Sequence, residues 1–120
     1  VISLHIPQTT ETNGMIDKNF IDRVKNPFWF LNSARGKAVR TTDLVEGLRS
    51  KKILGAALDV LEYESSSFHS IFGAKNRPET LDYLLNSDAV LLSPHVAGWT
   101  FESHIKLAPT IVDKVAALNL

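Results

Sequence analysis

The sequence predicts an α/β fold in which helices flank a parallel β-sheet. Short segments rich in β-branched, aromatic or other apolar residues alternate with longer segments whose apolar residues recur at helical spacing. Strands that alternate with helices usually pair in parallel through right-handed crossovers. With 120 residues, of which 44% are hydrophobic and 22% charged, the chain has the size and composition of one globular domain.

The first predicted strand covers residues 1–4 and ends at Pro7, because proline lacks the N–H that would continue a ladder. Asn13-Gly14 then indicates a turn. Asp17 is placed to cap a helix that ends before Pro27. The apolar residues of this helix share one face: Phe20, Ile21 and Val24.

Residues 28–31 form the second predicted strand, which we place in the middle of the sheet. Its sequence, Phe-Trp-Phe-Leu, is apolar on both alternating faces, so we expect helices to cover both sides. The small residues Ser33, Ala34 and Gly36 follow and would let a ligand approach the backbone closely. Among them, Arg35 offers a planar fork of donors suited to a carboxylate or phosphate. Alternatively, Arg35 caps a neighbouring helix or pairs with a surface acid.

The next helix is expected to begin near Thr41 or Thr42, and its apolar face consists of Leu44, Val45 and Leu48. The third strand lies within residues 53–61. Asp59 falls inside this predicted strand, where a carboxylate is costly unless it is paired.

The rest of the chain predicts a loop of uncertain structure at residues 65–76, a short helix, and a fourth strand at residues 90–92. A last helix follows, and we expect a kink at Pro109 because an interior proline costs about 3 kcal/mol. The apolar residues of these two helices are Leu81, Leu84 and Leu85 in the first, and Ile105, Ala108, Ile111, Val112 and Val115 in the second.

The composition favours small-molecule chemistry. Thirteen basic and thirteen acidic residues cancel and form no basic cluster, so we expect neither a nucleic acid nor a membrane as partner. The lack of cysteine excludes disulfides and thiolate metal sites and suits a reducing, cytoplasmic compartment. The chain opens on Val1-Ile2-Ser3-Leu4, which resembles the middle of a strand. We therefore expect a piece of a longer protein.

A chemically useful side chain follows each predicted strand: His5, Arg35, Glu64 and His95. Ligands of open α/β sheets bind outside the carboxyl ends of the strands, so these side chains are expected at one site. Glu64 and His95 suggest a general acid/base pair in which the carboxylate favours the protonated imidazole. Together with Arg35, the pair would suit a hydroxy or keto acid. No two histidines stand at metal-ligand spacing, so we expect no metal site.

Each of these residues also has a purely structural interpretation. His95 could be a structural histidine, Glu64 a solvated loop acid, and Asp59 an acid that caps a helix or pairs in the core. For His5 we favour a ring bonded to backbone at the sheet end over a catalytic role. Two further histidines are expected at the surface: His69 and His104.

Four segments of the sequence indicate a particular protein family, which the spacing of single residues does not. They are Ser3-Leu4-His5-Ile6-Pro7, Asn32-Ser33-Ala34-Arg35-Gly36, Gly55-Ala56-Ala57-Leu58-Asp59-Val60 with Glu64, and Ser93-Pro94-His95-Val96-Ala97-Gly98-Trp99-Thr100. In this order, over nearly the whole chain, they closely resemble the NAD-dependent D-2-hydroxyacid dehydrogenase family, which includes D-3-phosphoglycerate dehydrogenase.

The resemblance implies the second half of a Rossmann-like parallel sheet with flanking helices, NAD as cofactor, and a homodimer at full length. Arg35 would bind and polarise the 2-keto or 2-hydroxy acid, and His95 would exchange a proton with the substrate oxygen, tuned by Glu64. Hydride would pass between the substrate C2 and the nicotinamide, whose carboxamide end Asp59 would contact. The residues expected around the cofactor are Ile6, Ser33, Ala34, Arg35, Asp59, His95, Ala97 and Gly98.

Several features of that family have no counterpart in residues 1–120: the glycine-rich phosphate loop, the acid that binds the adenosine ribose, and the separate substrate domain. We therefore expect a partial NAD-binding domain that on its own is inactive and is self-associated or poorly folded. Ser65 replaces a usual proline and Arg40 a common acid, which affects the expected loop geometry. The alternative function is a non-catalytic module of corepressor type that senses NAD(H) and binds protein partners.

Overall fold

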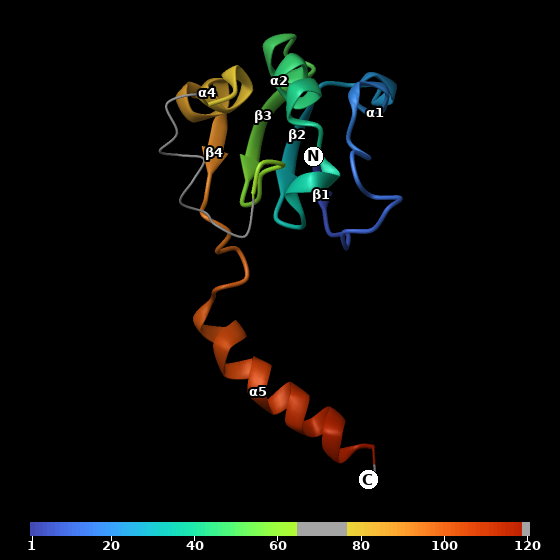
Figure 1. The fold of residues 1–120 in the computed structure, drawn as a ribbon, viewed down its shortest axis with the longest axis vertical. Coiled ribbons are helices and arrows are strands. Elements are labelled where there is room, and N and C mark those ends of the chain that lie inside the picture. Colours follow the sequence, from blue (N-terminus) through green and yellow to red (C-terminus); the bar gives the residue numbers. More distant parts are fainter. Residues whose placement is uncertain (65–76, 119–120) are drawn as a thin grey trace.

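The computed structural model describes residues 1–64 and 77–118 and shows a four-stranded sheet with helices (Figure 1). The predictions for residues 65–76, Ser65 and His69 included, lie outside these ranges. The elements in chain order are β1 (Ile2–Leu4), α1 (Lys18–Arg23), β2 (Phe28–Asn32), a 3₁₀ helix (Gly36–Ala38), α2 (Thr41–Arg49), β3 (Ile53–Leu58), α4 (Glu79–Asn86), β4 (Val90–Leu92) and α5 (Phe101–Ala116).

The strands follow one another across the sheet in the order β1-β2-β3-β4, and every neighbouring pair is parallel. Phe30 of β2 pairs with Ile2 on one side and with Ala56 of β3 on the other, and Ala56 pairs in turn with Val90. The predicted α/β class and the central position of residues 28–31 are thereby confirmed. Because all the strands run the same way, their carboxyl ends share one edge.

The core lies between the sheet and α2, which packs against β3 and contacts both α1 and α4. The predicted apolar face of α2 is buried, including Leu44 and Leu48. Gly47 allows the helix to approach closely, because a Cβ there would lie 2.9 Å from Cδ1 of Ile53. In α4, Leu81 and Leu84 are buried as expected, whereas Leu85 is exposed.

Carboxylates satisfy the first N–H groups of two helices. Asp17 caps α1 as predicted, since its Oδ1 accepts a hydrogen bond of 2.8 Å from the Phe20 N–H. Helix α2 begins differently, because its N-cap residue, Arg40, makes no capping bond with its side chain. Instead, Oε2 of Glu62 accepts a 2.7 Å bond from the Thr41 N–H. The carboxylate of a distant loop thus does the work that a local cap does in α1.

The second predicted strand is covered on one face, not on two. Phe28 and Phe30 are buried in the core beneath the helices, but Trp29 is 54% and Leu31 38% exposed. The prediction of cover on both sides is therefore wrong for the part of the chain described, because its helices pack on the face that holds Phe28. On the other face the indole of Trp29 lies across Gly55, where a Cβ would come within 2.5 Å of the ring.

The third strand is shorter than predicted. Pairing with β4 stops where Leu58 meets Leu92, and β3 ends there. Asp59 is therefore the first residue of the following loop, not a residue inside the strand. Its backbone still continues the ladder on one side, since the Asp59 N–H donates to the Asn32 carbonyl at 2.9 Å.

Helix α5 extends away from the sheet and the other helices (Figure 1). None of its residues is buried. The helix continues through Pro109 to Ala116, so the proline does not end it. Its exposed apolar residues include Phe101, Ile105, Leu107, Ile111, Val112 and Val115. Within the described ranges, no helix has the length and apolar character needed to cross a membrane.

Candidate active site

The four side chains singled out in the sequence all follow the carboxyl ends of strands, as predicted. His5 comes after β1, Arg35 after β2, Glu64 after β3 and His95 after β4. The strand order places β2 and β3 between the other two. Because neighbouring strands lie about 4.8 Å apart, β1 and β4 are separated by about 14 Å. His5 therefore comes from the strand farthest from that of His95.

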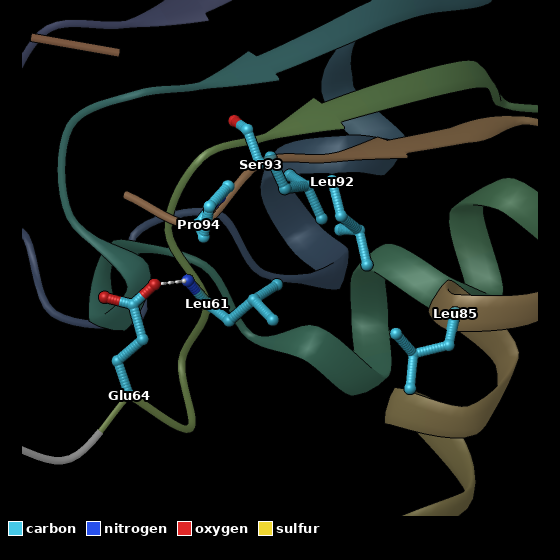
Figure 2. Close-up of a pocket in the computed structure, with 7 residues that line it drawn as sticks. Leu61, Glu64, Leu85, Leu92, Ser93 and Pro94 are labelled. Carbon is cyan, nitrogen blue, oxygen red and sulfur yellow. Dashed lines mark hydrogen bonds between the residues drawn. The ribbon is translucent and has the colours of Figure 1, made fainter. Parts of the chain in front are cut away.

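Glu64 and His95 are in contact. Oε2 of Glu64 lies 3.3 Å from Nδ1 of His95, while Oε1 accepts a 2.6 Å hydrogen bond from the Leu61 N–H (Figure 2). The carboxylate is thus held by its own turn and directed at the imidazole. The His95 side chain is 42% exposed and that of Glu64 22%. An imidazole that is tied to a carboxylate at one nitrogen and open to solvent suits proton exchange with a ligand.

The backbone of His95 adopts an uncommon conformation that helps to place its ring. Its φ of 56° lies in the left-handed region, which costs a non-glycine residue about 1 kcal/mol. The His95 N–H compensates by donating to the carbonyls of Asp59, at 2.9 Å, and Ser93, at 3.0 Å. The loop after β4 is therefore tied to the end of β3 at the catalytic candidate itself.

Asp59 fixes the same loop with its side chain. Oδ1 accepts hydrogen bonds from Ser93 Oγ at 2.6 Å and from the Val96 N–H at 2.8 Å, and Oδ2 accepts one from the Ala97 N–H at 2.9 Å. Burial acts to raise the pKa of Asp59, but these bonds and the nearby His95 outweigh it and hold the pKa below its ordinary value. These bonds are those expected of an acid paired in the core, which was the structural interpretation of Asp59, and they leave its predicted cofactor contact a proposal.

Asn32 organises the Arg35 loop in a similar way. It occupies a buried position at the end of β2, where its Oδ1 accepts from the Ala34 N–H and its Nδ2 donates to the Arg35 carbonyl, both at 3.1 Å. The Arg35 side chain is exposed, and its Nη1 donates to the Ala34 carbonyl at 2.7 Å. Because this guanidinium lies at the surface of the carboxyl edge, it is available to an anionic ligand after a rotamer change.

A cavity of about 220 Å³ lies beside the Glu64 carboxylate (Figure 2). Apart from Glu64 and Ser93, its walls are apolar and come from β3, β4, α4 and the loops after the two strands: Leu58, Leu61, Leu85, Leu92 and Pro94. Such a lining does not suit a small carboxylate, which needs a cation or several N–H donors. We therefore place the candidate site at the open edge between Arg35 and His95, not in this cavity.

The residues expected around a cofactor also lie along the carboxyl edge, on the loops after all four strands. Ser33, Ala97 and Gly98 are exposed, Ile6 is half-buried, and a Cβ at Gly98 would meet no atom within 4 Å. Oδ2 of Asp59 accepts a bond from the Ala97 N–H and can accept a second, for instance from a carboxamide. These residues leave open space and one acceptor at the carboxyl edge, where the cofactor is expected.

Two of the remaining histidines have other partners. Nε2 of the His5 ring lies 2.9 Å from Ser3 Oγ, so the prediction that the ring bonds to backbone is wrong. The two side chains meet because residues two positions apart in an extended segment point to the same face. His104 is exposed, as expected, and makes an edge contact with the Trp99 ring. Among the residues that the structure describes, no group of three or more potential ligands could hold a metal ion.

Sequence reasoning gave no individual role to three residues that shape the site: Asn32, Glu62 and Ser93. A usable signal existed only for Asn32, a polar residue at the alternating position that Phe28 and Phe30 occupy in the buried face of the strand. Ser93 and Glu62 act on partners that are far away along the chain, so no local pattern marks them.

Comparisons with known proteins agree with this geometry. Residues 1–97 match the model of the D-isomer specific 2-hydroxyacid dehydrogenase NAD-binding domain. Over 104 residues the chain is 38% identical to an aromatic 2-oxoacid reductase of Clostridium sporogenes, covering 86% of this chain and 31% of that protein. It is 34% identical to a D-lactate dehydrogenase of Staphylococcus aureus, covering 86% of this chain and 32% of that protein. The chain thus spans about a third of the length of these relatives.

Solved structures give the same result. D-lactate dehydrogenase with NAD⁺ from Lactobacillus jensenii superposes with a TM-score of 0.78 at 33% identity, covering 98% of this chain and 36% of that one. D-lactate dehydrogenase from Aquifex aeolicus, complexed with NAD and lactic acid, gives 0.74 at 31% identity, covering 97% and 36%. The predicted resemblance and its Rossmann-like fold are confirmed, and the chain belongs to the D-isomer specific 2-hydroxyacid dehydrogenase family, in its NAD-binding domain.

Proposed function

We propose that this chain is the catalytic half of the cofactor domain of an NAD-dependent D-2-hydroxyacid dehydrogenase. The observation that carries the proposal is the 3.3 Å contact between Glu64 and His95 at the carboxyl edge of the sheet. The names of the two relatives, a 2-oxoacid reductase and a lactate dehydrogenase, support 2-keto and 2-hydroxy acids as the substrate class.

In this proposal His95 holds the proton that the substrate oxygen gains or loses. Its Nδ1 faces Glu64, so Nε2 is the nitrogen that would meet the oxygen. Glu64 fixes the orientation of the ring and stabilises the imidazolium when His95 carries the proton. NAD, when bound, would supply the nicotinamide ring that donates or accepts the hydride.

Arg35 binds the substrate carboxylate. Its fork of donors matches two carboxylate oxygens, and the bond from Nη1 to the Ala34 carbonyl gives way when the side chain turns to the ligand. Ser33 and Gly98 leave the edge open for the cofactor, and Asp59 offers Oδ2 to its carboxamide. Ile6, Ala34 and Ala97 complete this lining.

The remainder of the full-length protein would supply the phosphate-binding half of the cofactor domain and the substrate domain, since this chain spans about a third of its relatives. We infer that residues 1–120 alone are inactive and that the full-length protein is a homodimer. The particular 2-keto acid is set largely by the substrate domain.

The test is an assay of the full-length protein with NADH and a panel of 2-keto acids, among them pyruvate and arylpyruvates. We expect NADH oxidation with at least one acid, and loss of most of that rate in His95→Ala. Glu102→Gln, an exposed change on α5, is the matched control and should leave the rate unchanged. If NADH binds but no acid is reduced, the enzyme proposal fails and a non-catalytic NAD(H)-sensing module takes its place.

A further inference from the structure

Glu62 lies between the two halves of the candidate site, and no step of the proposed reaction uses it. This half-buried residue belongs to the turn after β3 that also carries Glu64. Its Oε2 receives the 2.7 Å bond from the Thr41 N–H at the start of α2. The side chain of Arg40 makes no capping bond, so Glu62 supplies the carboxylate that accepts from the Thr41 N–H, and it joins Asp43 of the first turn at the positive end of the α2 dipole.

A second contact joins the same two segments. A Cβ at Gly36 would lie only 1.9 Å from the Leu61 carbonyl oxygen and 2.8 Å from the Glu62 nitrogen. The 3₁₀ helix that starts at Gly36 is therefore packed directly on the turn after β3. Arg35 immediately precedes this contact, so the position of its backbone depends on that turn.

The turn after β3 also contacts the acid/base pair formed by Glu64 and His95. The Leu61 N–H, next to Glu62, donates the 2.6 Å bond that holds Oε1 of Glu64, and Oε2 of Glu64 faces His95. A continuous set of short contacts thus leads from Thr41 through residues 61–64 to the imidazole. It joins the loop that would bind the substrate carboxylate to the loop that would handle its proton.

We propose that Glu62 is a positioning residue that clamps the Arg35 loop against the Glu64–His95 pair. Its bond to Thr41 and the Gly36 contact hold the segment after Arg35 at two points, at the first residue of the 3₁₀ helix and at the first residue of α2. The inference rests on the proposed function in one respect, namely that Arg35 binds the substrate carboxylate. The clamp itself is a contact between two segments of this chain and does not depend on that function.

Two substitutions of Glu62 distinguish the effect of its hydrogen-bond acceptor from the effect of its negative charge. Glu62→Ala removes the cap, whereas Glu62→Gln keeps an oxygen that can accept from the Thr41 N–H. Asp17→Ala is the matched control, because it removes a carboxylate–N–H bond of 2.8 Å from α1, a helix that carries no proposed site residue. Any loss caused only by weakened folding should appear in this control as well.

The first measurement is steady-state kinetics of the full-length protein. A displacement of about 1 Å at a binding group can cost up to about a hundredfold, so we expect the KM for the 2-keto acid to rise at least about tenfold in Glu62→Ala. The KM for NADH should change less than the KM for the acid, because only part of the proposed cofactor lining lies on the Arg35 loop, and Glu62→Gln should recover most of the loss. An unchanged KM for the acid in Glu62→Ala, or an equal rise in Asp17→Ala, would overturn the proposal.

The second measurement is amide hydrogen exchange of the same full-length variants, which does not depend on activity. In Glu62→Ala the Thr41 amide should exchange at least about fivefold faster, as expected for loss of a helix cap, and in Glu62→Gln by less. Unchanged protection at Thr41 would show that no clamp exists. If the wild type reduces no 2-keto acid, the proposed function fails, but this measurement still decides the clamp.

Discussion

Asp59→Asn is the substitution whose effect the structure specifies best. The carboxylate accepts three hydrogen bonds from the loop after β4, which carries His95. An asparagine keeps one oxygen, which can still accept from Ser93 Oγ and the Val96 N–H. Its NH₂ group, however, then faces the Ala97 N–H, so two donors meet at a position that is only 7% exposed.

The expected cost follows from counting these bonds. Loss of one charge-assisted bond at a buried site costs about 1–3 kcal/mol, and the two that remain become neutral and weaken by about half. We therefore expect the free energy of unfolding of the full-length protein to fall by about 2–4 kcal/mol. The left-handed backbone of His95 should also lose support, so the rate of NADH oxidation falls too.

The effect should depend on pH. The folded-state pKa of Asp59 lies below the ordinary value of 3.8, so its stabilisation is complete above the unfolded-state pKa and is lost as the pH falls through the folded-state pKa. Urea unfolding at pH 7 and at pH values below about 4 should therefore show the difference between wild type and Asp59→Asn shrinking in acid.

The exposed Asp88 provides the control, since Asp88→Asn changes the charge equally without removing buried bonds. The reasoning is refuted if Asp59→Asn costs less than about 0.5 kcal/mol at pH 7, the range of ordinary surface changes. It is also refuted if the difference from wild type stays the same at low pH.

Three further predictions concern the site and the isolated chain. In the full-length protein, Arg35→Lys keeps the charge but loses the planar fork, so kcat should fall and the KM for the 2-keto acid should rise; a wild-type kcat/KM would remove Arg35 from carboxylate binding. Glu64→Gln removes the carboxylate charge that lies 3.3 Å from the His95 ring, so the rate of keto-acid reduction should fall, and a wild-type rate would disprove the pairing. Residues 1–120 alone should self-associate or fold poorly, because Trp29 and Leu31 lie exposed on the uncovered face of the sheet. They should also bind NAD weakly, because the glycine-rich phosphate loop has no counterpart in them; a monodisperse monomer in light scattering that binds NAD tightly in calorimetry would contradict this.

Local chemistry allowed much of the fold to be predicted. The Asp17 cap, the start of α2 at Thr41 and the order of strands and helices each depend on residues within a few positions of one another. The placement of Arg35, Glu64 and His95 at one edge also follows from sequence, because each comes soon after a strand and the strands are parallel.

The tertiary structure decided how these parts are held together. Asp59 bonds to residues 34 to 38 positions away, and Glu62 to a residue 21 positions away. Such partners meet only after the sheet register is set, so no local pattern reveals them. The same holds for the end of β3 at Leu58, which is set by its pairing with β4.

For this protein, then, the sequence by itself determined which residue types stand at the ends of the strands, because turns, caps and periodicity act over one or two turns of chain. Only the tertiary structure decided which of those residues touch. It brought Glu64 to His95, left His5 with Ser3, and left one face of β2 open. The physical reason is that a contact between loops depends on the register and order of the strands that carry them, and these arise from the packing of the whole sheet against its helices.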